Sequence, residues 1–241
     1  MPSVQRSLPR DVLRALPLQV ALLVWLSVSA GLGALGWLAG LACAAALLVG
    51  LTLGLRQVGA RGLGPADQVT LARASLVCGV AALVVDGSGR PVALGPLVGL
   101  TGVALALDAV DGWVARRTAT ASRFGAGFDM EVDAFLILVL SVHVARSAGA
   151  WVLLIGAARY LLLVSGWALP WLQGPVPARY WRKVVAAVQG VVLAVAASTV
   201  LPTWLSGLAL LLALGLLAES FGRDVVFLSR QRSLRHELVS T

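Results

Sequence analysis

The sequence predicts an all-α integral membrane protein with about eight transmembrane spans. Its 241 residues are 59% hydrophobic and only 12% charged, with a mean hydropathy of +0.91. Soluble domains usually carry about twice that share of charged residues. Apolar runs near or above 18 residues recur along the chain, and each is long enough to cross a bilayer. Short polar or glycine- and proline-rich stretches separate these runs, so no sizeable soluble domain is expected.

The first apolar run, 18–55, is too long for one span, and the glycine-rich stretch 31–36 predicts that it forms a hairpin of two helices. Six further spans are expected at about 66–85, 91–115, 126–147, 149–170, 184–201 and 203–222. Turn-forming residues separate several of them, at 86–91, 147–149, 173–177 and 201–202. Gly36/Gly40 and Gly50/Gly54 have the spacing of close helix contacts, but glycine and alanine are common enough here to supply such pairs by chance.

The basic residues predict the orientation of the spans. With the N-terminus inside, most of the 19 arginines and lysines fall in cytoplasmic segments, as the positive-inside rule requires. This places a basic segment at 1–17 and a basic tail at 223–241 in the cytoplasm of a multi-pass cell-membrane protein. The net charge of +8 is explained by topology and by contact with anionic lipids in the bilayer, so nucleic acid is not expected as a partner.

Acidic residues gather where two predicted spans meet. Five of the chain's 11 acids lie in one stretch: Asp108, Asp111, Asp129, Glu131 and Asp133. Asp108 and Asp111 are three apart on one helix, and Asp129 and Asp133 are four apart on the next, so each pair shares a helix face. The connection 117–124 is short and polar, which predicts antiparallel neighbours and lets four carboxylates converge. Glu131 is out of register with both pairs.

Such a cluster predicts a divalent cation. A carboxylate in a bilayer costs roughly 2.5–3.5 kcal/mol on insertion scales, and neighbouring carboxylates also repel one another. Oxygen ligands suit a hard ion such as Mg²⁺ or Mn²⁺. Since Mg²⁺ usually keeps positions open for water or phosphate oxygens, a phosphorylated substrate is expected with it. The alternative is a solvated acidic loop, which the regular helical spacing disfavours.

The residues around these pairs resemble the signature of the class I CDP-alcohol phosphotransferase (CDP-alcohol phosphatidyltransferase) family. The stretch reads Asp108-x2-Asp111-Gly112-x2-Ala115-Arg116-x8-Gly125-x3-Asp129-x3-Asp133, and every position of the signature is filled. A weaker resemblance to a family segment P-N-x-V-T-x-x-R covers 66–73, where Thr70 and Arg73 match while Ala66 and Asp67 differ. In a later segment Lys183 and Gln189 match, and Ala186 replaces a threonine.

The resemblance covers about 65–222 and implies a core of six transmembrane helices around a polar cavity open to the cytoplasm. It also implies a homodimer. The catalytic core is therefore expected at 63–222. The hairpin at 18–62 is an addition to that core, to which the sequence assigns no chemical role.

The resemblance further implies an activity in phospholipid biosynthesis. A CDP-alcohol, most often CDP-diacylglycerol, would transfer its substituted phosphate group to a small acceptor alcohol with release of CMP, using Mg²⁺ or alternatively Mn²⁺. Asp108, Asp111 and Asp129 would bind the metal, and Asp133 would contact it as well but serve better as general base. The CDP moiety would be lined by Gly112, Ala115, Arg116 and Gly125, with Thr70 as a weaker candidate.

The acceptor site is predicted from basic residues alone. Arg159 lies inside a predicted span, where an ionised residue is a functional candidate, and an arginine that reaches the interface is the alternative. Arg182 and Lys183 add a basic cluster, which ordinary topology also explains. Together they favour a phosphorylated acceptor such as glycerol phosphate or inositol phosphate, as in phosphatidylglycerophosphate or phosphatidylinositol phosphate synthases. A neutral or zwitterionic acceptor stays open.

Two other functions use acidic residues in membranes. A transporter or cation channel predicts internal repeats, and the sequence shows one acidic cluster with no second copy. An intramembrane prenyltransferase also uses aspartate pairs and magnesium, but its pairs lie on separate repeats rather than across one short turn.

Overall fold

The structure, a computed structural model, describes residues 10–59, 63–118, 122–169, 171 and 180–240. Within the helices, the side chains at 10–15, 111, 113–116, 118, 123, 168, 180, 230 and 232–240 are not described. Every regular element in the described ranges is helical, which confirms the all-α class. The predicted turn at 173–177 and the first nine residues of the predicted basic segment lie outside these ranges.

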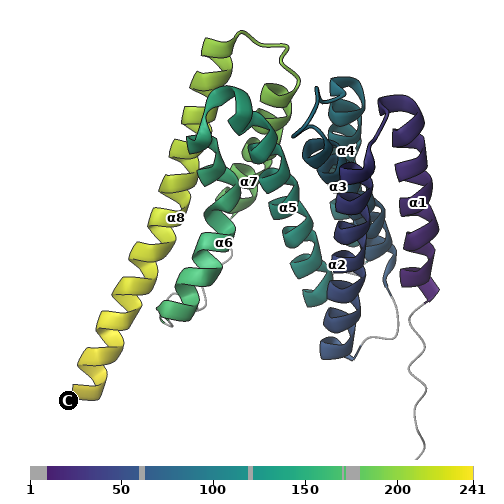
Figure 1. Ribbon diagram of the computed structural model, residues 1–241. Coiled ribbons are helices and arrows are strands. Elements are labelled where there is room, and N and C mark those ends of the chain that lie inside the picture. Colours follow the sequence, from purple (N-terminus) through teal and green to yellow (C-terminus); the bar gives the residue numbers. More distant parts are fainter. Residues whose placement is uncertain (1–9, 60–62, 119–121, 170, 172–179, 241) are drawn as a thin grey trace, which may run out of the picture. The chain divides into compact units, whose positions relative to one another are not determined.

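The helices follow the order expected from the sequence (Figure 1). They are α1 (Arg10–Ala30), α2 (Ala34–Val58), α3 (Pro65–Asp86), α4 (Leu94–Thr118), α5 (Arg123–Ala148), the short 3₁₀ helix η1 (Ala150–Val152), α6 (Leu153–Ala168), α7 (Tyr180–Ala197) and α8 (Thr203–Ser240). Two helices meet at the predicted glycine-rich turn, because Gly31 ends α1 with a left-handed φ of 64° and α2 begins three residues later. The basic tail was predicted to begin at residue 223. Helix α8 continues past this point to Ser240, so the described part of the tail is helical.

Several of these helices can cross a membrane. Among the described residues, four stretches are long and apolar enough: Ala34–Val58, Pro65–Asp86, Ala150–Trp167 and Thr203–Ser229. Two shorter apolar helical stretches, Leu16–Ala30 and Leu94–Val110, accompany them. Length and composition therefore indicate a multi-pass membrane protein.

The contacts divide the chain into two compact units, and α5 runs from one into the other. The first unit ends at Val139 and the second begins at Leu140. In the second unit α7 packs against α8, and the buried Gln189 donates a hydrogen bond from Nε2 to the carbonyl of Ala213 at 2.7 Å.

Helix α3 forms the centre of the first unit, where it packs against α1, α2 and α4. Within its apolar window 72% of the residues are buried, against 17–22% in the other three candidate spans, so α3 is covered by protein while the others expose apolar side chains. Small residues allow α3 and its neighbouring helices to pack closely together. Gly79 of α3 lies against Leu22 and Leu100, and Ala82 faces Gly40 of α2.

The additional hairpin is tied to the C-terminal end of α3. One carboxylate oxygen of Asp86 accepts hydrogen bonds from the backbone N–H groups of Gly33 (3.1 Å) and Gly36 (3.2 Å), while the other pairs with Arg90. Asp86 thus caps α2 from a different helix and satisfies N–H groups that the start of a helix leaves without partners. The hairpin is a packed part of the first unit.

Candidate active site

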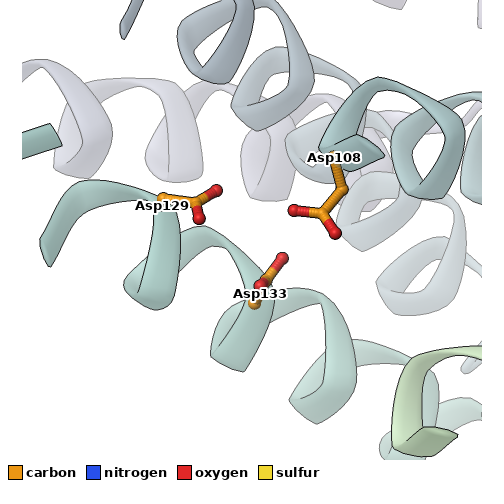
Figure 2. A group of neighbouring side chains, drawn as sticks. All are labelled: Asp108, Asp129 and Asp133. Atoms are coloured by element: carbon orange, nitrogen blue, oxygen red, sulfur yellow. The ribbon is translucent and has the colours of Figure 1, made fainter. Parts of the chain in front are cut away.

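Three of the predicted acidic residues converge in the first unit. Asp108 projects from α4, and Asp129 and Asp133 project from successive turns of α5. Figure 2 shows the three carboxylates facing one another, and each offers an oxygen within 4.8 Å of the other two. We call these three residues the carboxylate cluster. Their meeting confirms that the acidic ends of the two predicted helices come together.

A buried arginine holds the carboxylate cluster. Arg73 of α3 donates from Nη1 to Asp108 (2.5 Å) and Asp133 (2.9 Å), and from Nη2 to Asp129. Its side chain is 2% exposed, whereas those of Asp108, Asp129 and Asp133 are 40%, 38% and 34% exposed. The guanidinium therefore lies beneath the cluster, and the carboxylates lie between it and the surface of the unit.

Local interactions at its start set the position of α5. Ser122 precedes the helix, and its hydroxyl oxygen accepts a hydrogen bond from the N–H of Gly125 at 2.8 Å, which is an N-cap. Phe124 and Phe128 pack against a buried cluster on α2 and α3 that includes Leu51 and Leu71. Phe128 directly precedes Asp129 on α5, and Asp133 follows one turn after Asp129. The apolar contact therefore anchors the helix that supplies two of the three carboxylates.

Gly125 lies against another acidic side chain. A Cβ atom added at Gly125 would be 2.2 Å from Oδ1 of Asp67, closer than any real contact. Asp67 is itself buried at the start of α3, where its Oδ2 accepts a hydrogen bond from the N–H of Gly64 at 3.0 Å. The glycine of the predicted CDP site therefore has a packing reason of its own: α3 and α5 approach here through the side chain of Asp67.

The other predicted CDP-site residues have mixed outcomes. Thr70 lies one turn before the buried arginine on α3, and its own side chain is buried, with the hydroxyl donating to the carbonyl of Ala66 at 3.2 Å. Gly112 belongs to α4 and is partly exposed. The backbone of α4 also includes Asp111, Ala115 and Arg116, but their side chains lie outside the described part of the structure, so their predicted roles stay predictions.

The predicted acceptor residues belong to the second unit. Arg159 is partly buried on α6, and Lys183 is exposed on α7. Arg182 forms an ion pair with Asp224 of α8, with Nε 2.8 Å from Oδ2. Their role in binding an acceptor stays a prediction.

Arg73 and Asp67 were not predicted as site residues. The signal for Arg73 was present, because an ionisable residue inside an apolar span is a functional candidate in general. The same rule predicted a role for Arg159, whereas Arg73 entered only as a position that matches the family segment. No comparable signal pointed to the contact between Asp67 and Gly125, since it depends on how two helices cross.

The donor atoms of the site fit a divalent cation. The three carboxylates are oxygen ligands, which hard cations such as Mg²⁺ prefer. Three carboxylates and one guanidinium leave two formal negative charges, which one divalent ion balances. The partial exposure of the carboxylates leaves them accessible to an ion and to a substrate.

Comparison with protein families is consistent with this site. The sequence model described as CDP-alcohol phosphatidyltransferase matches residues 64–217, which is more than half of the chain and includes α3, α4 and the whole carboxylate cluster. Comparisons with curated proteins and with solved structures gave no match. The chain therefore belongs to the CDP-alcohol phosphatidyltransferase family, a transferase family that carries out phospholipid-type phosphotransfer.

Proposed function

We propose that this protein transfers a substituted phosphate group from CDP-diacylglycerol to a small acceptor alcohol and releases CMP. The observation that carries this proposal is the convergence of Asp108, Asp129 and Asp133 within the segment that matches the family. The family implies a CDP-alcohol, an acceptor alcohol and a lipid environment, and the diacylglycerol donor is our more specific choice.

Asp108, Asp111, Asp129 and Asp133 are the residues that would hold the metal, with Mg²⁺ as the ion and Mn²⁺ as its substitute. Family members depend on divalent metals in general, and three of these carboxylates meet in the structure. When bound, the ion would neutralise charge on the diphosphate and on the leaving phosphate. The aspartates supply oxygen ligands from two helices, so their alignment sets where the diphosphate is placed.

Asp133 is proposed as the general base. It would accept the proton of the acceptor hydroxyl as the oxygen of that group forms a bond to the β-phosphorus of the donor. The bond between this phosphorus and the bridging oxygen breaks, and CMP leaves with that oxygen. At 34% exposure the side chain of Asp133 is accessible to a substrate, and its hydrogen bond to Arg73 orients one of its oxygens.

Gly112, Ala115, Arg116, Gly125 and Thr70 are proposed to line the CDP moiety. Gly125 lies one turn before Asp129 on α5, and Thr70 lies one turn before Arg73 on α3, the arginine that donates to the carboxylate cluster. Arg116 would pair with a phosphate. For the acceptor we propose a phosphorylated alcohol such as glycerol phosphate or inositol phosphate, recognised by Arg159, Lys183 and Arg182, because three basic residues suit a phosphate group.

We further propose eight spans, six of them in the family core, in a homodimer of the cell membrane with the carboxylate cluster facing the cytoplasm. The basis for this orientation is the distribution of arginine and lysine along the sequence.

The test is to incubate purified protein with CDP-diacylglycerol, Mg²⁺ and a panel of alcohols: glycerol phosphate, inositol phosphate, inositol and serine. CMP and the lipid product are measured together. We expect CMP in equal amount to one new phospholipid, formed with a phosphorylated acceptor and abolished by chelation. Release of CMP with no acceptor dependence would contradict the transfer, and turnover with serine alone would contradict the acceptor class.

A further inference from the structure

In the proposed reaction Arg73 only orients one oxygen of Asp133, although it donates hydrogen bonds to every residue of the carboxylate cluster. Its guanidinium is buried on α3, which is the most protein-covered of the four candidate spans, and donates to all three carboxylates. A buried arginine is costly unless its charge is balanced, and here three carboxylates from two other helices balance it. Arg73 is thus a built-in cation at the place where the family's reaction needs a metal.

Arg73 and a metal ion would use the same ligands. The guanidinium takes Oδ1 of each aspartate, and the oxygens that could hold an ion belong to the same three carboxylates, within 4.8 Å of one another. Two cations that share three carboxylates repel each other. Even in a medium as polar as water, a single positive charge and a divalent cation about 5 Å apart repel strongly enough to weaken binding about tenfold.

We propose that Arg73 is an internal counter-cation that competes with the divalent ion for the carboxylate cluster and thereby sets the metal affinity of the site. The proposal rests on the proposed metal site and adds a specific role for Arg73. In the metal-free protein Arg73 offsets the repulsion among the carboxylates and keeps α4 and α5 together. When a metal binds, it replaces part of that interaction, so the protein gives up contacts with Arg73 in exchange for metal coordination.

Competition predicts a gain in metal affinity when the arginine charge is removed. A residue that only positioned the carboxylates would show the opposite, because its loss would weaken metal binding. The sign of the change therefore separates the two roles. It also separates competition from a general structural role, since a destabilised protein has no reason to bind metal more tightly.

The experiment measures Mn²⁺ binding to the purified full-length protein by electron paramagnetic resonance, without substrate. Arg73→Gln is compared with wild type, and Arg90→Gln serves as the matched control because it removes an arginine paired with an aspartate at the other end of α3. We expect Arg73→Gln to bind Mn²⁺ at least about tenfold more tightly and Arg90→Gln to match wild type. Thermal unfolding should show a larger stabilisation by Mn²⁺ for Arg73→Gln than for wild type.

Unchanged or weaker Mn²⁺ binding by Arg73→Gln would overturn the proposal. If that variant does not accumulate, Arg73→Met removes the charge without burying an amide and carries the same expectation. In a further test the Arg73 variant is purified in Mn²⁺ and the metal is then removed with a chelator. Unfolding of the metal-free variant that added Mn²⁺ reverses would support the counter-cation role of Arg73. A metal-free variant as stable as the metal-free wild type would contradict it. Wild-type protein that binds no Mn²⁺ would count against the metal site itself, which is a separate outcome.

Discussion

Replacing Gly125 by alanine tests whether packing against Asp67 fixes the start of α5. The added Cβ would lie 2.2 Å from Oδ1 of Asp67 and 3.1 Å from Oγ of Ser122. A carbon and an oxygen in contact lie about 3.3 Å apart, so about 1 Å of movement is needed. Asp67 can turn away only by giving up its hydrogen bond to Gly64, since it is buried beside that N–H group. The alternative is a displacement of α5.

Either movement has a cost that can be estimated. Loss of the cap costs about 1 kcal/mol, and overpacking typically costs about 1–3 kcal/mol. We therefore expect Gly125→Ala to unfold at a lower temperature. Asp129 follows one turn later on α5, and a displacement of about 1 Å in a catalytic group can cost about 100-fold in rate. CMP release by Gly125→Ala should fall by about that factor.

Two further variants test whether the contact with Asp67 causes the expected loss of activity. Gly127→Ala is the matched control, because a Cβ there meets nothing within 4 Å in the described structure, and it should keep wild-type activity. In Asp67→Ala/Gly125→Ala the carboxylate that makes the closest contact is gone, so the double variant should recover the activity of Asp67→Ala alone. A double variant as impaired as Gly125→Ala would refute the packing argument and show that the glycine is needed by the nucleotide.

Three other predictions concern the general base Asp133, the packing of Gly54 and the buried amide of Gln19. Asp133→Asn should lower CMP release by about 100-fold or more, as loss of a general base does, while weakening Mn²⁺ binding less than Asp129→Asn; near-normal turnover would contradict the role. Gly54→Ala should destabilise the protein by about 1–2 kcal/mol, because its Cβ would meet the ring of Phe124, whereas Gly50→Ala, with open space around it, should be neutral. Gln19→Leu should raise the unfolding temperature, since Gln19 is 2% exposed and its amide has no hydrogen-bond partner among the described residues; burying such a group costs about 1–3 kcal/mol, and an unchanged temperature would disprove this.

The sequence predicted the positions of the helices well because hydropathy and turn chemistry are local properties. The hairpin turn at Gly31 and the start of α5 near the predicted span at 126–147 are examples. The extent of α8 was not predicted, because hydropathy marks where a span ends and not where a helix ends. Glu219 and Arg223 pair one turn apart across the predicted end of the span at residue 222, and such a pair supports a helix that continues past it.

The carboxylate cluster was predicted because helical spacing and one short connection bring Asp108 near Asp129 and Asp133. The surroundings of the cluster were not predictable in the same way. Arg73 is 35 residues from Asp108 and reaches it only because α3 is the central helix of the first unit. Likewise, the contacts of Gly54 with Phe124 and of Gly125 with Asp67 depend on how helices cross, which no periodicity in the sequence records.

The role of the additional hairpin also follows from the structure alone. The sequence assigned no chemistry to residues 18–62, yet Leu51 and Leu55 of α2 belong to the buried cluster on which Phe124 and Phe128 of α5 pack. The hairpin thereby supports the helix that carries Asp129 and Asp133. This support explains why a substitution as far from the carboxylates as Gly54→Ala is expected to affect the protein.

We propose above that side chains from α4 and α5 together bind one divalent cation. Crystals soaked in Mn²⁺ and measured for anomalous scattering test it most directly. We expect an anomalous peak within coordination distance of carboxylate oxygens of Asp108, Asp129 and Asp133, and its disappearance in Asp129→Asn. A peak elsewhere would contradict a metal site at these residues. Carboxylates that point away from one another, with no ion between them, would contradict it as well.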